Sequence, residues 1–146
     1  MKNMYKKVFL DANIFIDVND KKRVSYEESF KIISYLLINE VEIYTSCDLI
    51  TTIYYILSKN DKLNALYKID EINDFCKIIE FSNQEVKQTC ELMKTNPKYK
   101  DLEDTIQYIL AKKEGCDLII SNDKEFISDD IELLTTAKFI EKLNIV

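Results

Sequence analysis

Short apolar runs alternate along the chain with longer segments in which apolar residues recur at helical spacing. The short runs cover Val8–Leu10, Val41–Thr45, Lys77–Phe81, Asp117–Ile120 and Ile131–Leu134. The intervening segments place apolar side chains three or four positions apart, which is the spacing of an amphipathic helix. Strands that alternate with helices of about ten or more residues indicate βα units, so we expect an α/β fold with a parallel sheet and helices on both faces.

Residues with capping preferences mark where the predicted helices begin and end. Ser25 followed by Glu28 is a capping-box pattern, which predicts a helix start. Either Ser46 or Asp48 can cap the helix that follows the second apolar run. Gly115, the single glycine of the sequence, stands where a helix needs a left-handed residue at its carboxyl end. These signals agree with the alternation of strands and helices.

Length and composition favour one globular domain that spans residues 1–146. Hydrophobic residues make up 47% of the sequence and charged residues 32%, which is ordinary for a folded domain. A single Gly and a single Pro exclude a glycine-rich phosphate loop and a dinucleotide-binding fingerprint. The lack of histidine excludes Ser/His/Asp triads, Cys/His pairs and HExxH zinc sites. Carboxylate, lysine or thiolate chemistry remains.

Charge and cysteine spacing restrict the cellular setting and the partners. The cysteines, Cys47, Cys76, Cys90 and Cys116, include no CxxC pair, so we expect buried free thiols. The amino-terminal apolar run is interrupted by Asp11 and is too short for a signal peptide or a membrane span, which predicts a cytoplasmic protein without a membrane partner. The net charge of −6 argues against sequence-independent binding to duplex nucleic acid.

Two of the predicted strands end in aspartate. Asp11 follows Val8–Leu10 directly, and Asp123 comes shortly after the run that ends at Ile120. In open parallel sheets, ligands bind beyond the carboxyl ends of the strands, near the point where the strand order reverses. Asp11 and Asp123 therefore stand where such a sheet places its chemistry.

A third acidic element opens the helix before the fourth predicted strand. Asp101 and Asp104 are three positions apart and share one helix face, whereas Glu103 points about 100° away from Asp104. Gathering Asp11, Asp104 and Asp123 would cost heavily through like-charge repulsion unless they share protons or a cation. Hard oxygen ligands suit Mg²⁺ or Mn²⁺, and the chemistry that they imply is metal-assisted phosphodiester hydrolysis.

Each acid also has a purely structural explanation. Acids in a first helical turn interact favourably with the helix dipole, and Asp101 can cap its helix. Asp11 can equally cap the helix that begins near Asn13, and Asp123 can belong to a loop turn. Acids at two strand ends and on one helix are harder to explain together in this way.

Three segments of the sequence resemble the PIN-domain ribonucleases, and in particular the VapC-type toxins of type II toxin-antitoxin systems. The segments are L-D-A-N-I-F-I-D, D-L-E-D-T-I-Q and I-I-S-N-D-K-E-F, and the similarity covers nearly the whole chain. The resemblance implies a three-layer α/β/α fold with a central parallel sheet of about five strands. It makes Asp11, Asp104 and Asp123 the catalytic acids and the ligands of Mg²⁺ or Mn²⁺, with Asn13 orienting the first acid and Ser121 in the usual Ser/Thr position.

The chain departs from this family at one position. A further acid, often Glu, commonly stands in the helix after the second strand, where this sequence has Thr51 and Thr52. Asp48 lies about one turn too early in that helix. Asp101, one turn before Asp104, is the other possible substitute. We therefore expect that Asp101 or Asp48 supplies the missing carboxylate, or that the metal site is incomplete.

The favoured hypothesis is a metal-dependent endoribonuclease that acts on single-stranded RNA as the toxin of a toxin-antitoxin pair. Its expected partners are RNA, a cognate antitoxin protein and a second copy of the chain in a homodimer. Lysines that could contact RNA phosphates are Lys98, Lys100, Lys112, Lys113 and Lys124.

Two other functions belong to different classes. A PIN-like module that binds RNA or protein through an incomplete, inactive metal site is the main alternative. Phosphatases of the haloacid-dehalogenase type also place a nucleophilic Asp after the first strand, but they need a second acid two residues later. This chain has Asn13 there, which would leave the nucleophile without its acid/base partner. A metal titration with Asp11→Asn as the control separates the nuclease from the binding module.

Overall fold

Five parallel strands form the centre of the protein in a computed structural model that describes residues 4–145. The strands are β1 (Lys7–Leu10), β2 (Glu42–Ser46), β3 (Cys76–Ile79), β4 (Leu118–Ile120) and β5 (Glu132–Leu134). They lie in the order β3-β2-β1-β4-β5, and every neighbouring pair is parallel. The predicted parallel α/β sheet is therefore confirmed.

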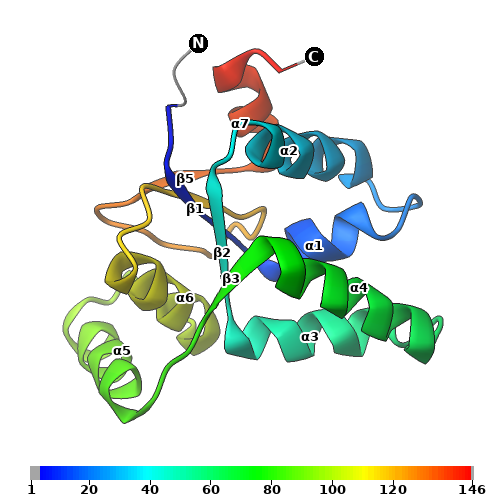
Figure 1. Cartoon of the computed structure of the whole chain (residues 1–146). Helices are drawn as coiled ribbons and strands as arrows, with labels where there is room; N and C mark the ends of the chain where they lie inside the picture. The colour runs from blue at the N-terminus through cyan, green and yellow to red at the C-terminus, as the bar shows by residue number, and fades with distance from the viewer. Residues whose placement is uncertain (1–3, 146) are drawn as a thin grey trace.

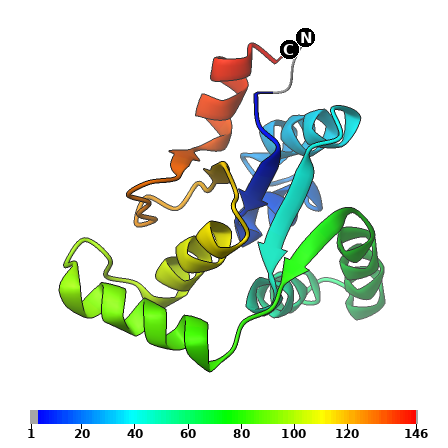
Figure 2. The same ribbon diagram turned by 60° about the vertical axis from the view of Figure 1, so that its left-hand side comes forward.

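Helices cover both faces of this sheet (Figure 1). Within residues 4–145 they are α1 (Ala12–Val18), α2 (Tyr26–Ile38), α3 (Cys47–Leu57), α4 (Lys62–Phe75), α5 (Asn83–Thr95), α6 (Leu102–Lys113) and α7 (Thr136–Leu143). Helices α1 to α4 carry the chain from β1 to β3, whereas α5 and α6 carry it back to β4. Because such crossovers are right-handed, the two directions put the helices on opposite faces, and Figure 2 shows α5 and α6 apart from α2 and α4. The expected three-layer α/β/α arrangement is confirmed.

None of these helices combines the length and the apolarity that a membrane span needs, as far as residues 4–145 are concerned.

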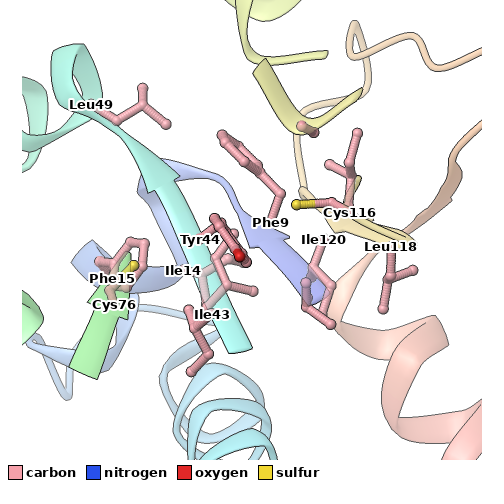
Figure 3. Packing of buried hydrophobic residues seen from close by; sticks show 14 of the residues in the cluster. Phe9, Ile14, Phe15, Ile43, Tyr44, Leu49, Cys76, Cys116, Leu118 and Ile120 are labelled. Atoms are coloured by element: carbon pink, nitrogen blue, oxygen red, sulfur yellow. The ribbon is translucent and has the colours of Figure 1, made fainter. Parts of the chain in front are cut away.

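Apolar side chains on both sides of the central strands make the core. Val8, Phe9 and Leu10 of β1 are fully buried, and so are all the residues of β4. A strand that is covered on both faces needs apolar residues at consecutive positions, which explains why these runs are continuous rather than alternating. Figure 3 shows Phe9 of β1, Tyr44 of β2 and Leu118 of β4 within this packing. The core thus fixes the backbone just before the carboxyl ends of β1 and β4.

The direction of travel across the sheet reverses between β1 and β4, because the chain runs from β1 to β2 and β3 on one side and returns to β4 and β5 on the other. Hydrogen bonding continues past the strand ends. The Asp11 N–H donates to the Ile120 carbonyl at 3.1 Å, and the Ser121 N–H donates to the Leu134 carbonyl at 3.1 Å. The residues after β1 and β4 are therefore held side by side at the switch point, where open parallel sheets bind ligands.

The predicted helix ends are confirmed, Ser25 included as the N-cap of α2, but one predicted capping motif is absent. Asp101 caps α6, and Gly115 follows that helix with the expected positive φ of 72°. The capping box predicted at Ser25 and Glu28 does not form, because Ser25 makes no side-chain capping hydrogen bond. Glu28 instead accepts a hydrogen bond from the Thr136 hydroxyl at 2.8 Å, so a contact with α7 takes its carboxylate away from the helix end.

The cysteines are free, as predicted, but they are not all buried. Cys76 and Cys116 are buried, Cys90 is half-buried, and Cys47 at the start of α3 is exposed. Burial raises the pKa of the Cys76 and Cys116 thiols to about 12, so both behave as small apolar residues of the core.

We expect Gly115→Ala to destabilise the protein through backbone strain alone. Gly115 has a φ of +72°, and a Cβ added there would meet no atom within 4 Å. A residue with a Cβ loses about 1–2 kcal/mol in this conformation, so urea unfolding should show a loss of that size. Gly115→Asn is the matched control and should lose less, because Asn tolerates the left-handed region. Equal losses in the two variants would contradict the strain explanation.

Candidate active site

Asp11 is fixed where β1 meets α1. It is the N-cap residue of α1, and its Oδ1 accepts a hydrogen bond from the Ala12 N–H at 2.8 Å. Its Oδ2 accepts a hydrogen bond from the Ser121 hydroxyl at 2.7 Å. Only 7% of Asp11 is exposed, and burial raises the pKa of its carboxyl although both hydrogen bonds oppose that shift. Asp11 is therefore a helix cap and also a buried acid at the edge of the sheet.

Ser121 links the two acids that follow β1 and β4. Its hydroxyl donates to Asp11 and accepts a hydrogen bond from the Asp123 N–H at 3.1 Å. Asp123 also has the loop-turn geometry considered from the sequence, since its Oδ1 accepts from the Glu125 N–H at 2.9 Å. The side chain of Ser121 thus lies between two of the predicted site acids and contacts both residues.

Asp104 approaches the same edge from the first turn of α6. Burial, followed by the charges of Asp123 and Asp11, raises the pKa of its carboxyl to about 7. A side-chain hydrogen bond with Asp123 contributes to the same shift. Repulsion from Asp123 and Asp11 therefore favours the protonated form of Asp104 in the absence of a cation. The structure brings the three predicted acids into one electrostatic unit.

The neighbours of Asp104 in α6 have different environments. Asp101 is exposed, and its Oδ1 accepts the capping hydrogen bond from the Asp104 N–H at 2.9 Å. Helical spacing predicts that Glu103 points away from Asp104, but the charges of the acidic site still act on its carboxyl. Burial, and then the charges of Asp48, Asp101 and Asp11, raise the pKa of its carboxyl. Glu103 therefore belongs to the rim of the acidic site, which sequence reasoning did not predict.

Asp48 adds a further carboxylate from the start of α3. It is half-buried and accepts hydrogen bonds from the Ser46 hydroxyl and from Gln107 Nε2, the latter at 2.9 Å. After burial, the charge of Asp48 is among the causes that raise the pKa of Asp11. Sequence reasoning missed Gln107, although it lies three residues after Asp104 and so on the same face of α6.

Polar and basic side chains lie beside the acids. Asn13 was expected to orient Asp11, but no hydrogen bond joins the two side chains in the described structure. Asn13 instead lines a hollow of about 380 Å³ together with Asn122, Lys22 and Arg23. This hollow adjoins the acidic edge, since Asn13 and Asn122 are one or two residues away from the acids that follow β1 and β4.

Two of the lysines that the sequence offered for RNA contacts are engaged within the protein. Lys112 pairs with Asp130 at 2.7 Å, and Lys113 donates to the Glu80 carbonyl at 3.2 Å. An acid already neutralises Lys112, so its contribution to RNA binding is smaller than the sequence suggests.

The donor atoms of this edge are hard carboxylate and amide oxygens, the ligands that Mg²⁺ and Mn²⁺ prefer. Across residues 4–145, no three acidic or thiol side chains stand where they could hold one metal ion together. The raised pKa values of Asp11 and Asp104 result from burial and from repulsion among the acids, and a bound cation would relieve both. The chemistry of the site thus fits a divalent cation, and coordination would require the carboxylates to turn toward it.

We expect Asp104→Asn to stabilise the metal-free protein above neutral pH. The pKa of Asp104 is raised from 3.8 to about 7 on folding. The stability that the protonated carboxyl contributes is therefore complete below pH 3.8 and is lost as the pH rises through about 7. Asn removes that loss, and the variant should gain about 1–2 kcal/mol at about pH 8 after screening of a partly exposed side chain. Urea unfolding in EDTA measures the gain.

The exposed acid Asp70 of α4 provides the matched control for this measurement. Asp70→Asn should keep the pH dependence of the parent. If Asp104→Asn also kept the parental pH dependence of stability, the repulsion inferred at the acidic edge would be contradicted.

Comparisons with known proteins agree with the geometry. The model of the PIN domain matches residues 8–130. Ribonuclease VapC1 of Aquifex aeolicus (strain VF5) is 52% identical over 139 residues, which cover 95% of this chain and 96% of that protein.

Two solved structures share the fold at low sequence identity. VapBC2 from Rickettsia felis, bound to a DNA fragment from its promoter, is 22% identical with a TM-score of 0.68 over 88% of this chain and 98% of that one. VapC20 from Mycobacterium tuberculosis, described as a sarcin-ricin loop cleaving toxin, is 13% identical with a TM-score of 0.65 over 82% and 92% of the two chains. The family model spans most of the sequence and the relative from Aquifex aeolicus is identical at over half of the aligned positions, so the chain belongs to the PIN-domain family.

Proposed function

We propose that the protein is a Mg²⁺- or Mn²⁺-dependent endoribonuclease that cleaves single-stranded RNA in the cytoplasm as the toxin of a toxin-antitoxin pair. The observation that carries this proposal is the meeting of Asp11, Asp104 and Asp123 at the switch point of the sheet, with Ser121 in contact with two of them. The 52% identity with a relative named ribonuclease VapC1 supports the same activity. A cognate antitoxin and a homodimer are part of the proposal.

Each acid has a part in the proposed cleavage. A divalent cation, when bound, neutralises charge on the scissile phosphate and acidifies the water beside it. Hydrogen bonds from Ser121 and from the Ala12 N–H orient Asp11 at the edge of the sheet, where it would help to hold the cation. Burial and the charges of Asp123 and Asp11 raise the pKa of Asp104 to about 7, so Asp104 can hold a proton near neutral pH when no cation is bound.

In the proposed reaction, the oxygen of water attacks phosphorus and a carboxylate of the cluster accepts the proton that the water loses. The bond between phosphorus and the 3′ oxygen breaks, and the 3′ oxygen takes a proton from solvent. The products carry a 5′-phosphate and a 3′-hydroxyl. No histidine is needed in this scheme, which is consistent with a chain that has none.

The basic hollow beside the acids is proposed to hold the RNA strand. Arg23 Nε pairs with the buried Asp17 at 2.6 Å, and the described structure contains no other side-chain partner of this guanidinium. The remaining donors of Arg23 are therefore available in the hollow that Lys22 and Asn122 also line. A guanidinium fork anchored at one nitrogen suits a phosphate oxygen pair. A phosphate bound there would lie next to the acidic edge.

A PIN-like binding module without catalytic activity is the second candidate function. It is favoured by Thr51 and Thr52, which stand where the family resemblance places a further acid. It is also favoured by the finding that no three acids or thiols among residues 4–145 are placed to hold one metal ion. In that case RNA or a protein would bind without being cleaved.

We expect the purified protein to cleave defined single-stranded RNAs with Mn²⁺ and to be inactive in EDTA. Asp11→Asn should lower the cleavage rate by about 100-fold or more. It should leave the metal-free protein at least as stable as the parent, because burial and like charges raise the pKa of Asp11. Mapping of the RNA ends and melting curves measure the two effects.

Cleavage that continued in EDTA, or that Asp11→Asn carried out at the parental rate, would overturn the metal-dependent nuclease. RNA binding by the parent without any cleavage would favour the binding module.

A second prediction concerns the basic hollow. In an Asp104→Asn background, replacing Arg23 by Gln together with Asp17→Asn removes the ion pair without changing the net charge or leaving a buried charge unpaired. If Arg23 contacts a phosphate, the slope of log affinity for single-stranded RNA against log salt should become shallower by about 0.7. Lys62→Gln on α4 is the control and should change nothing. An unchanged slope in the double substitution would place the RNA elsewhere.

A further inference from the structure

Gln107 carries an unpaired polar atom beside the acidic site. Its side chain is fully buried, and its Nε2 donates a hydrogen bond to Asp48 Oδ2 at 2.9 Å. Among the buried side-chain nitrogen and oxygen atoms of residues 4–145, its Oε1 alone lacks a hydrogen-bond partner. Buried acceptors are nearly always paired, and an unpaired one is costly. We therefore expect this carbonyl to have a donor that the protein itself does not supply.

Asp48 is fixed next to this amide. One oxygen of its carboxylate accepts a hydrogen bond from the Ser46 hydroxyl, and the other accepts from Gln107 Nε2. A carboxylate offers about four lone-pair sites, so further ligands can bind it. Asp48 follows β2, which pairs with β1, and Gln107 lies three residues after Asp104 on α6. The hydrogen bond from Gln107 therefore places Asp48 beside the edge that carries the other acids.

Asp48 also lacks a cationic partner. In the described part of the chain, no lysine or arginine forms an ion pair with it. Its two hydrogen-bond donors are neutral, and a half-buried carboxylate among other acids is stabilised most by a cation. Asp101, the other substitute considered from the sequence, likewise forms no ion pair within residues 4–145, but its environment is different. It is exposed, and its Oδ1 is engaged in capping α6.

We propose that Asp48 is the fourth carboxylate of the divalent-cation site, and that Gln107 positions it and accepts a hydrogen bond from water that hydrates the cation. The inference rests on the proposed metal-dependent function and adds the residues that complete its site. Mg²⁺ and Mn²⁺ bound by a few carboxylates keep several waters, and those waters are strong donors. One hydrated cation would thus satisfy the free lone pairs of Asp48 and the orphaned carbonyl of Gln107. Gln107 is a positioning residue, because it acts through Asp48 and water.

A purely structural tie between α3 and α6 is the competing explanation for this pair. Such a tie accounts for the hydrogen bond from Gln107 to Asp48, but it leaves the buried Oε1 without a donor. Asp48 also lies in the first turn of α3, where the helix dipole favours an acid, but that preference does not supply a donor to the Gln107 carbonyl. The two explanations differ in whether Mn²⁺ affinity depends on Asp48.

Calorimetric titration of Mn²⁺ into the full chain tests the inference. Asp48→Asn preserves the hydrogen bonds, because its Oδ1 can accept from Gln107 and its amide can donate to the Ser46 oxygen, but it deletes the charge. We expect the Mn²⁺ affinity to fall by about tenfold or more. Asp101→Asn is the matched control, since Asn caps a helix about as well as Asp, and it should keep the parental affinity.

A second variant tests the positioning role. Gln107→Met replaces the amide with an apolar side chain of similar length and should also weaken Mn²⁺ binding by about tenfold, with a parental circular dichroism spectrum. A structural tie would change only the melting temperature. Should Asp48→Asn lack the parental spectrum, Asp48→Ser takes its place in the titration.

The outcomes separate this inference from the proposed function. Parental Mn²⁺ affinity in Asp48→Asn and Gln107→Met, with binding lost in Asp104→Asn, would overturn the inference and leave the nuclease standing. If Asp101→Asn were the only variant of the two aspartates with weakened Mn²⁺ binding, the fourth carboxylate would be Asp101, and the inference about Asp48 would be overturned as well. A parent that bound no Mn²⁺ would overturn both the inference and the proposed function.

Discussion

Like-charge repulsion between carboxylates that the fold cannot separate is the constraint on which the site depends. Asp11 follows β1 and Asp123 follows β4, and the pairing of these two strands keeps the residues side by side. Ser121 contacts both of them. Asp104 reaches the same place from α6, and its pKa rises to about 7 through burial and through the charges of the other two acids. Sheet topology thus concentrates negative charge at one edge, where a proton or a cation must balance it.

The core explains why the backbone does not relax to relieve this repulsion. β1 and β4 are buried on both faces, and close-packed interiors resist the shifts that would move the acids apart. The conflict is therefore confined to side chains: the raised pKa of the Asp104 carboxyl, and an unpaired carbonyl on Gln107. Functional sites commonly retain such local conflicts, which a ligand then resolves. In this protein, a hydrated divalent cation would resolve both at once.

The strands and the meeting of Asp11 with Asp123 were predictable because each follows from a local pattern joined to a general rule, whereas the place of Asp104 followed from the family resemblance. Continuous apolar runs predicted β1 and β4, and the geometry of parallel sheets then brought Asp11 and Asp123 together. The features that were missed all depend on contacts between distant elements. Gln107 meets Asp48 across 59 positions, and the Thr136 hydroxyl reaches Glu28 across 108, so no local periodicity indicates either contact. For the same reason the pattern could not choose between two substitutes for the missing acid.

Carboxyl-carbon NMR of Asp104, followed between about pH 4 and pH 9 with and without Mg²⁺, tests most directly whether repulsion at this edge is balanced by a cation. Without Mg²⁺, the account predicts a titration near the raised pKa of about 7. With saturating Mg²⁺, the pKa of Asp104 should fall well below that value, because the cation stabilises the ionised carboxylate. A titration that stayed at the same pH in Mg²⁺ would contradict the account, since the acids would then be balanced by protons alone.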